Sequence, residues 1–287
     1  MTDFVTSALD KGGMKRSAMG KPPPQLHSAL PRSLMEGVSG EVEQRLGIAS
    51  LKHRGPLKTP AAVDGAGLVR AIYDRIKTNY DTGNASKNRD RSAENWRWPR
   101  LVPSKDLERN SPEVKVERAI AQAAMSFRPD AWGNQIPVAS GLIDGARERR
   151  RAIDLVRKHA NDHFELIELK IKSDTPLYAA VEILGYGCLW LLAHLDRPTR
   201  HSPLLDAQRL GLQVLAPAKF YRGLPLQQLE ESLDEGIRRL GSSLGVDMHF
   251  SFRVLDAAIN ADALPGPLTL LRILENSPRL ILRTDAT

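Results

Sequence analysis

The chain has 287 residues, a formal net charge of +7 and a single cysteine. This length accommodates one large α/β domain with an additional segment, and the lone cysteine excludes a fold stapled by intramolecular disulfides, which fits a cytoplasmic protein. The first residues show no charged-then-apolar leader, so we expect neither a targeting segment nor a membrane partner.

The positive charge is concentrated in the first third of the chain. Residues 1–105 contain 18 Lys and Arg against 10 Asp and Glu, a net +8, which leaves −1 for residues 106–287. The first third is also rich in Pro, Gly, Ser and Asn, with KPPPQ at 21–25 and TGNASKNRDRS at 82–92. We therefore predict a basic, partly irregular N-terminal extension over 1–105, in which 1–60 is loosely ordered or orders on a partner, followed by a larger domain over 106–287.

Apolar periodicity predicts the secondary structure in chain order. The extension has helix patterns at 34–46 and 65–80. The larger domain has a helix pattern at 111–127, strands at 134–139, 152–156 and 164–171, a helix at 177–195, a strand at 211–221, a helix at 226–244 and a strand at 246–255. The last strand alternates apolar and polar residues, which is typical of a sheet edge, and residues 256–287 are expected to form a short helix and an irregular tail.

The longest apolar stretch is the helix pattern at 177–195. Glu182, Tyr186 and glycines interrupt it, so we predict a core helix rather than a membrane span. Cys188 lies within this stretch and is expected to be a small core residue, not a nucleophile.

Two of the predicted strands carry ionisable side chains where a buried strand normally carries Val or Leu. The polar residues between them form a turn, and a hairpin symmetric about Asn161 would place Asp154 opposite Glu168. Side chains alternate along a strand, so Lys170 would lie one step further on the same face. Two carboxylates this close repel each other, and a hard cation such as Mg²⁺ resolves the conflict by taking oxygen ligands from both.

This pattern resembles the PD-(D/E)XK nuclease superfamily. The matching residues are Asp154, then Glu168-Leu169-Lys170, then an acidic residue on the following helix. The resemblance covers a little over half of the chain and departs from the family at the Pro-Asp pair, where Ile153 stands before the aspartate. It implies a restriction-endonuclease-like fold, with an αβββαβ core in which helices flank a central mixed sheet, often followed by a further helix and strand.

The resemblance also implies roles for individual residues. Asp154 and Glu168 would bind Mg²⁺ or Mn²⁺, with the carbonyl of Leu169 as a third oxygen ligand. Lys170 would position or activate the attacking water and offset charge on the phosphate. Glu117, on the helix predicted at 111–127, would supply another ligand or contact a water.

Several of the polar side chains have a structural explanation beside the functional one. Glu182 and Tyr186 stand where many family members carry Gln and Tyr, as auxiliary residues, yet Glu182 could face solvent at the helix edge. Glu117 is better explained as a charged residue on a solvated helix face. His159 and His163 flank the predicted turn and are better explained as exposed turn residues than as zinc ligands.

Two short segments combine the features of a nucleic-acid contact. Trp96, Arg97 and Trp98 place aromatic faces between cations, which suits base stacking, although the two tryptophans are slightly better explained as docking this arm onto the core. The run at 147–151 could hold the substrate backbone or form a solvated hairpin end. Its candidate residues are Arg149, Arg150 and Arg151.

We therefore expect a metal-dependent nuclease that hydrolyses phosphodiester bonds of nucleic acid, with DNA as the expected substrate. The alternative is a non-catalytic nucleic-acid- or protein-binding module on a nuclease-like scaffold, in which the charged strand residues form a salt-bridged network. The sequence leaves open whether the protein acts as a homodimer or in a larger complex.

Overall fold

The computed structural model describes residues 30–51, 63–83, 92–103, 111–141, 151–172, 174–222 and 226–280. They form an α/β protein in which a five-stranded mixed sheet packs against helices. The helices and strands are α1 (Val38–Leu46), α2 (Gly65–Thr82), α3 (Pro112–Phe127), β1 (Trp132–Pro137), β2 (Ala152–Ala160), β3 (His163–Leu169), α4 (Pro176–Leu195), β4 (Arg209–Pro217), α5 (Leu226–Ser243), β5 (Asp247–Leu255) and α6 (Pro267–Glu275).

The strands lie in the order in which they occur in the sequence, from β1 to β5. The β1–β2 and β2–β3 pairs are antiparallel, whereas β3–β4 and β4–β5 are parallel. Antiparallel neighbours can be joined by a tight turn, but parallel neighbours need a crossover, which α4 and α5 supply. The strand β5 is therefore at one edge, as its alternating sequence predicts.

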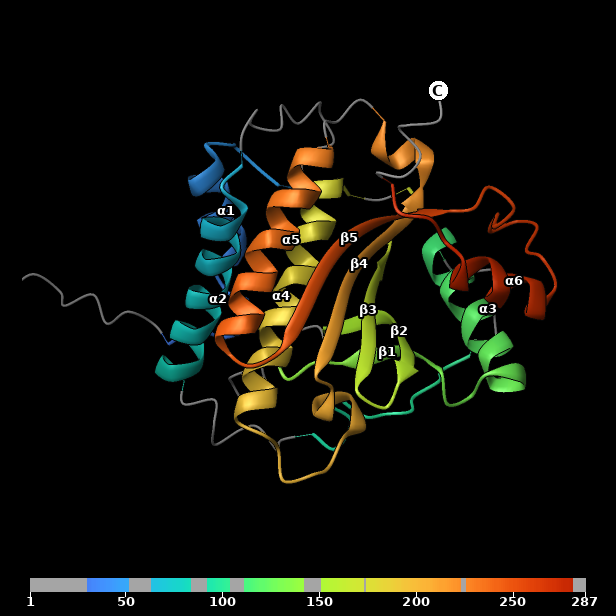
Figure 1. Cartoon of the computed structure of the whole chain (residues 1–287), viewed down its shortest axis with the longest axis horizontal. Coiled ribbons are helices and arrows are strands. Elements are labelled where there is room, and N and C mark those ends of the chain that lie inside the picture. Colours follow the sequence, from blue (N-terminus) through green and yellow to red (C-terminus); the bar gives the residue numbers. More distant parts are fainter. Residues whose placement is uncertain are drawn as a thin grey trace, which may run out of the picture.

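Helices cover both faces of the sheet (Figure 1). The helices α4 and α5 lie against one face, with α1 and α2 outside them, while α3 and α6 lie on the opposite side. The helices α2 and α5 approach closely at Gly65 and Gly236, where a Cβ on Gly236 would lie 2.5 Å from the Gly65 carbonyl oxygen. Each face of the sheet thus has its own apolar core.

The N-terminal helices share the core of the larger domain. Leu68, Ile72 and Ile76 of α2 belong to the same buried apolar cluster as residues of α4 and α5. The expected division of the chain at residue 105 stays a prediction, but this core extends across it. Residues 1–29, to which most of the loosely ordered segment belongs, lie outside the described residues.

The helix α4 lies in the core, as predicted. Thr175 caps its N-terminus, with the hydroxyl oxygen accepting a hydrogen bond from the Tyr178 amide at 3.1 Å. Among the described residues it is the one helix long and apolar enough to cross a membrane, with a mean hydropathy of 1.5, but 83% of that stretch is buried inside the protein. Its apolar composition therefore follows from contacts with the sheet and with α2.

Most predicted elements are confirmed, with shifts at their ends. The strand predicted to run to residue 221 was wrong at its end, since β4 stops at Pro217 and residues Ala218–Tyr221 form a 3-10 turn. Proline has no amide hydrogen and cannot continue the ladder. The helix predicted at 111–127 is α3, with Ser111 as its N-cap.

Side chains of α5 cover the free edge of β5. Glu230 Oε2 accepts a hydrogen bond from the Phe252 amide at 3.0 Å, and Asp234 Oδ1 accepts one from the Phe250 amide at 2.7 Å. The Val254 amide donates to the carbonyl of Pro278 at 3.0 Å. Edge strands with unpaired amides recruit foreign strands, so these acceptors close the edge as well as stabilise it.

Replacing Glu230 with Ala is expected to lower the free energy of unfolding by about 1–3 kcal/mol, because the buried Phe252 amide would lose its acceptor. Urea denaturation of the full chain measures the change. The exposed neighbour Glu231 is the control, and Glu231→Ala should change stability by less than about 0.5 kcal/mol. Equal losses in the two variants would contradict this role for Glu230.

Candidate active site

The β2–β3 hairpin has the predicted register. Leu155 pairs with Ile167 and Lys158 pairs with Phe164, so the hairpin is symmetric about Asn161 as far as Lys158, and next to the turn the register shifts so that Ala160 pairs with His163. Continued by one step, this register would place Asp154 opposite Glu168, and both side chains line one cavity. The Asp154 carboxylate accepts a hydrogen bond from the Leu169 amide at 3.0 Å, which ties it to the end of β3. The two carboxyl groups therefore lie on the same side of the sheet, on the face that α4 covers.

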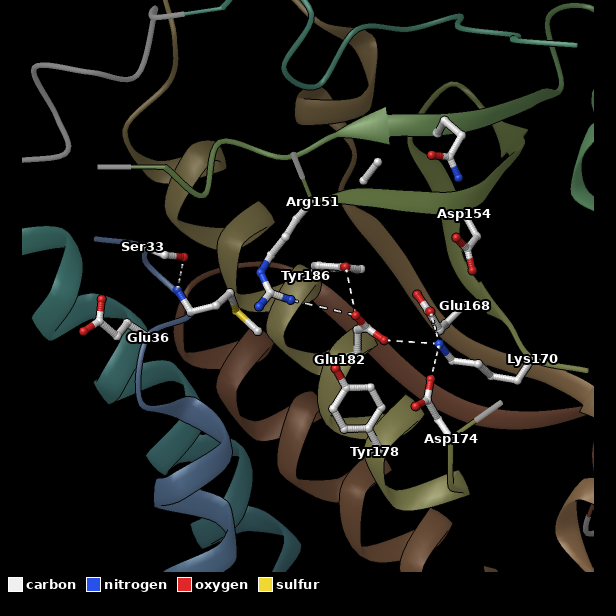
Figure 2. A pocket seen from close by; sticks show the side chains of 13 residues that line it. Ser33, Glu36, Arg151, Asp154, Glu168, Lys170, Asp174, Tyr178, Glu182 and Tyr186 are labelled. Atoms are coloured by element: carbon white, nitrogen blue, oxygen red, sulfur yellow. Dashed lines mark hydrogen bonds and ion pairs between the residues drawn. The ribbon is translucent and has the colours of Figure 1, made fainter. Parts of the chain in front are cut away.

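Lys170 follows directly after β3 and lies among three carboxylates. Its Nζ is 2.7 Å from Glu168 Oε1, 3.2 Å from Asp174 Oδ2 and 3.3 Å from Glu182 Oε2. Only 9% of the lysine side chain is exposed. Figure 2 shows Asp154, Glu168 and Lys170 converging from the strand ends towards Glu182 on α4.

These residues line a cavity of about 610 Å³. The sheet, α4 and the segment at residues 33–36 form its walls. Five carboxylates and two cations line it, a formal excess of three negative charges. These charged residues are Glu36, Asp154, Glu168, Asp174, Glu182, Arg151 and Lys170. This excess charge repels an anionic substrate, and bound cations would reduce the repulsion.

Burial and mutual repulsion disfavour the charged forms of the two acids. Burial raises the pKa of Asp154 to about 6, against the opposing charge of Lys170. Burial and the charge of Asp154 raise the pKa of Glu168 well above its ordinary value. Burial alone would lower the pKa of Lys170, but Glu168 and Glu182 outweigh it and the net shift is upward. Lys170 therefore stays protonated near neutrality.

The paired acids fit a divalent cation. Glu168 Oε2 is buried and has no hydrogen-bond partner among the described residues. In the described part of the chain, no group of three or more His, Cys, Asp or Glu side chains is arranged to bind a metal ion. Mg²⁺, however, usually keeps several waters and takes only one or two carboxylates from the protein. Asp154 and Glu168 would be those two, and the Leu169 carbonyl stays a prediction as a third ligand.

Glu117 lies on α3, beside the site but not in the cavity wall. Asn134 Nδ2 donates to one carboxylate oxygen at 2.5 Å and Gln135 Nε2 donates to the other at 2.9 Å. Burial, opposed by the Asn134 hydrogen bond and increased by the charge of Asp154, raises the pKa of Glu117 to about 7. Glu117 is thus electrostatically coupled to the site, and its role as a ligand stays a prediction.

Gln135 reaches the cavity through an uncommon backbone conformation. Its φ of 50° lies in the left-handed region, where a residue with a Cβ is strained, and its side chain connects Glu117 to the cavity wall. Asp174, with φ of 63°, is a second residue of this kind. Neither residue was predicted from the sequence to line the cavity. The sequence spacing could have indicated the contact of Asp174 with Lys170, because an acidic side chain four residues after the lysine can reach its ammonium group.

The nucleic-acid-binding residues expected near Trp96 are mostly engaged within the protein. Trp96 is 1% exposed and lies in the apolar core, which supports the explanation that it docks this segment rather than stacks on bases. The Trp98 ring packs edge-on against Phe164 at 5.0 Å. Arg97 is exposed and pairs with Glu94 at 2.8 Å.

The arginines of the second segment fall in two groups. Arg151 lines the cavity and its Nη1 is 3.8 Å from Glu182 Oε1. Arg149 and Arg150 lie outside the described residues.

The contacts of His159, His163 and Cys188 are explained by structural roles. His159 and His163 stack at 4.6 Å beside the turn, and His159 Nε2 is 2.6 Å from the Glu165 carboxylate. Cys188 is buried in α4 and burial raises its pKa, which disfavours a reactive thiolate.

Comparisons with models of protein families, with curated proteins and with solved structures found no match to this chain. The function therefore has to be inferred from the chemistry of the site.

Two glutamates of β3 are expected to respond oppositely to replacement by Gln. The folded-state pKa of Glu168 is raised, so its carboxylate costs stability as the pH rises above the ordinary value. In metal-free protein near about pH 8, Glu168→Gln should raise the free energy of unfolding by about 1–4 kcal/mol. The gain should vanish near about pH 4, where the carboxyl is protonated in both states.

Glu165 is the matched control on the opposite face of β3. Burial raises its pKa, but the hydrogen bond and charge of His159 outweigh burial, so the net shift is downward. Its carboxylate therefore stabilises the fold above the ordinary pKa, and this contribution is lost as the pH falls. Glu165→Gln should lower the free energy of unfolding by about 1.5–3 kcal/mol near neutrality. Changes of the same sign in both variants, in urea denaturation, would contradict these electrostatics.

Proposed function

We propose that this protein is a metal-dependent nuclease that hydrolyses phosphodiester bonds of nucleic acid, with DNA as the expected substrate. The observation that carries the proposal is the convergence of Asp154, Glu168 and Lys170 on one cavity, with one Glu168 oxygen lacking a partner among the described residues. Mg²⁺ or Mn²⁺ is the cofactor that this donor set favours.

The arrangement of elements supports assignment to the PD-(D/E)XK type. The order α3, β1, β2, β3, α4, β4 is αβββαβ around a mixed sheet, and α5 and β5 supply the further helix and strand. The acids lie at the ends of β2 and β3, and Glu182 lies on the following helix, as the resemblance implies. Fold alone does not imply function, so the proposal rests on the site.

Each residue has a role that its surroundings support. Asp154 and Glu168 would hold the divalent cation, and the hydrogen bond from the Leu169 amide fixes the Asp154 carboxylate in place. The cation would supply Lewis-acid chemistry by lowering the pKa of water and offsetting charge on the phosphate. Lys170 is held protonated, so it acts as a fixed positive charge that orients water and stabilises the developing negative charge, not as a general base.

One observation favours the non-catalytic alternative. Lys170 already contacts three carboxylates, so the cluster could be a self-contained network of ion pairs. Such a network would need no cation. The unpartnered Glu168 oxygen and the excess of negative charge favour the nuclease instead, because a closed network would satisfy its buried oxygens.

Asp154→Asn and Lys170→Met are each expected to lower cleavage at least about 100-fold, because the first weakens cation binding and the second removes the fixed charge. The measurement incubates the full chain with labelled circular and linear DNA and Mg²⁺ or Mn²⁺, and EDTA should abolish cleavage.

Two exposed neighbours serve as matched controls. Asp162→Asn lies at the hairpin turn and Lys172→Met lies two residues beyond Lys170. Both should keep wild-type cleavage. Cleavage that persists in EDTA, or that survives Asp154→Asn in a folded protein, would refute the metal-dependent mechanism.

A further inference from the structure

The cations of the cavity are not distributed evenly around the acids. Arg151 at the start of β2 and Lys170 at the end of β3 flank the same side chain, Glu182 of α4. The Tyr186 hydroxyl donates to Glu182 Oε1 at 3.3 Å, so a third donor points to the same carboxylate. Figure 2 shows these three donors surrounding Glu182. Two cations and a hydroxyl around one point are the donor set of an anion site.

Glu182 fills this site loosely. Its oxygens lie 3.8 Å from Arg151 Nη1 and 3.3 Å from Lys170 Nζ, whereas Lys170 lies 2.7 Å from Glu168. Charge-assisted hydrogen bonds are usually about 2.7–2.9 Å long, so the contacts to Glu182 are long. The side chains of Glu182 and Arg151 are 15% and 35% exposed, so both can rearrange towards the cavity.

We propose that Glu182 occupies the subsite of a substrate phosphate in the substrate-free protein, and that a phosphodiester group displaces its carboxylate from Arg151, Lys170 and Tyr186. This inference deepens the proposed function and rests on it. Lys170 also contacts Glu168, so the subsite adjoins the pair of acids that would hold the cation. The substrate phosphate therefore replaces an internal anion and adds no net repulsion at this point.

The surroundings of Tyr186 suit this exchange. Burial and the charge of Glu182 raise the pKa of Tyr186, so its hydroxyl stays protonated and remains a donor to either anion. A phosphodiester group carries one negative charge, like the carboxylate it replaces, but spreads its oxygens more widely. It can therefore reach both flanking cations at shorter distances than Glu182 does.

The test measures anion binding without metal, separately from cleavage. Isothermal titration calorimetry in EDTA follows inorganic phosphate, and then a short single-stranded DNA oligonucleotide, binding to the full chain. Glu182→Gln should bind both ligands at least about tenfold more tightly than wild type, because the competing charge is gone. Glu182→Ala should show the same gain and serves if the first variant does not fold.

Asp174→Asn is the matched control. It also removes one carboxylate from Lys170, but Asp174 has no contact with Arg151 among the interactions described above. The affinity of Asp174→Asn for both ligands should rise less than about threefold, since the substitution lowers the negative charge of the cavity without freeing the proposed subsite. The double variant Glu182→Gln/Arg151→Gln should lose the increase in affinity that Glu182→Gln shows.

Three results would overturn the subsite. These are equal gains in Glu182→Gln and Asp174→Asn, a gain that survives Arg151→Gln, or tighter binding of inorganic phosphate without tighter binding of the oligonucleotide. The cleavage assay is scored independently. Tighter binding of both phosphate and the oligonucleotide by Glu182→Gln, without any cleavage by the wild type, would support the anion subsite and contradict the nuclease. Metal-dependent cleavage by the wild type with no tighter binding in the variant would refute the subsite alone.

Discussion

The register of the β2–β3 hairpin is the constraint on which the site depends. Because side chains alternate along strands, a slip by one residue would send Glu168 to the opposite face and leave Asp154 without its partner. The turn at Asn161 and the pairing of Leu155 with Ile167 hold the register. Apolar residues on both faces, which belong to separate cores, penalise any slip. The packing of the fold thus fixes the geometry of the chemistry.

This arrangement concentrates unfavourable electrostatics in the cavity beside Glu168. Glu168 is buried and Asp154 is partly buried, and Lys170 and Arg151 together cannot neutralise these two acids along with Glu182 and Asp174. Elsewhere on the same strand, both carboxylate oxygens of Glu165 have side-chain partners, with His159 Nε2 2.6 Å from one and Gln213 Nε2 2.5 Å from the other. Stability alone would favour such matching at residue 168 too. We attribute the unbalanced negative charge around Glu168 to a function in ligand binding. A bound cation would offset this charge, and an anionic substrate could then bind beside the cation.

Local patterns in the sequence were enough to predict the elements and the central site, but not everything around it. Alternation along the strands and the turn residues identified the hairpin, and with it Asp154, Glu168 and Lys170. The burial of Trp96 was not decided by its sequence, because Trp-Arg-Trp suits either a stacking surface or a docking segment. The wall at residues 33–36 and the strained Gln135 depend on long-range packing, for which the sequence carries no periodic signal.

Anomalous diffraction from crystals of the full chain soaked in Mn²⁺ can show whether a cation binds between Asp154 and Glu168. We expect a peak within about 2.0–2.4 Å of carboxylate oxygens of both residues, a distance typical of oxygen ligands to such cations. A fully occupied peak elsewhere with this pair empty, or no peak at millimolar Mn²⁺ with Lys170 still bound to Glu168, would contradict it.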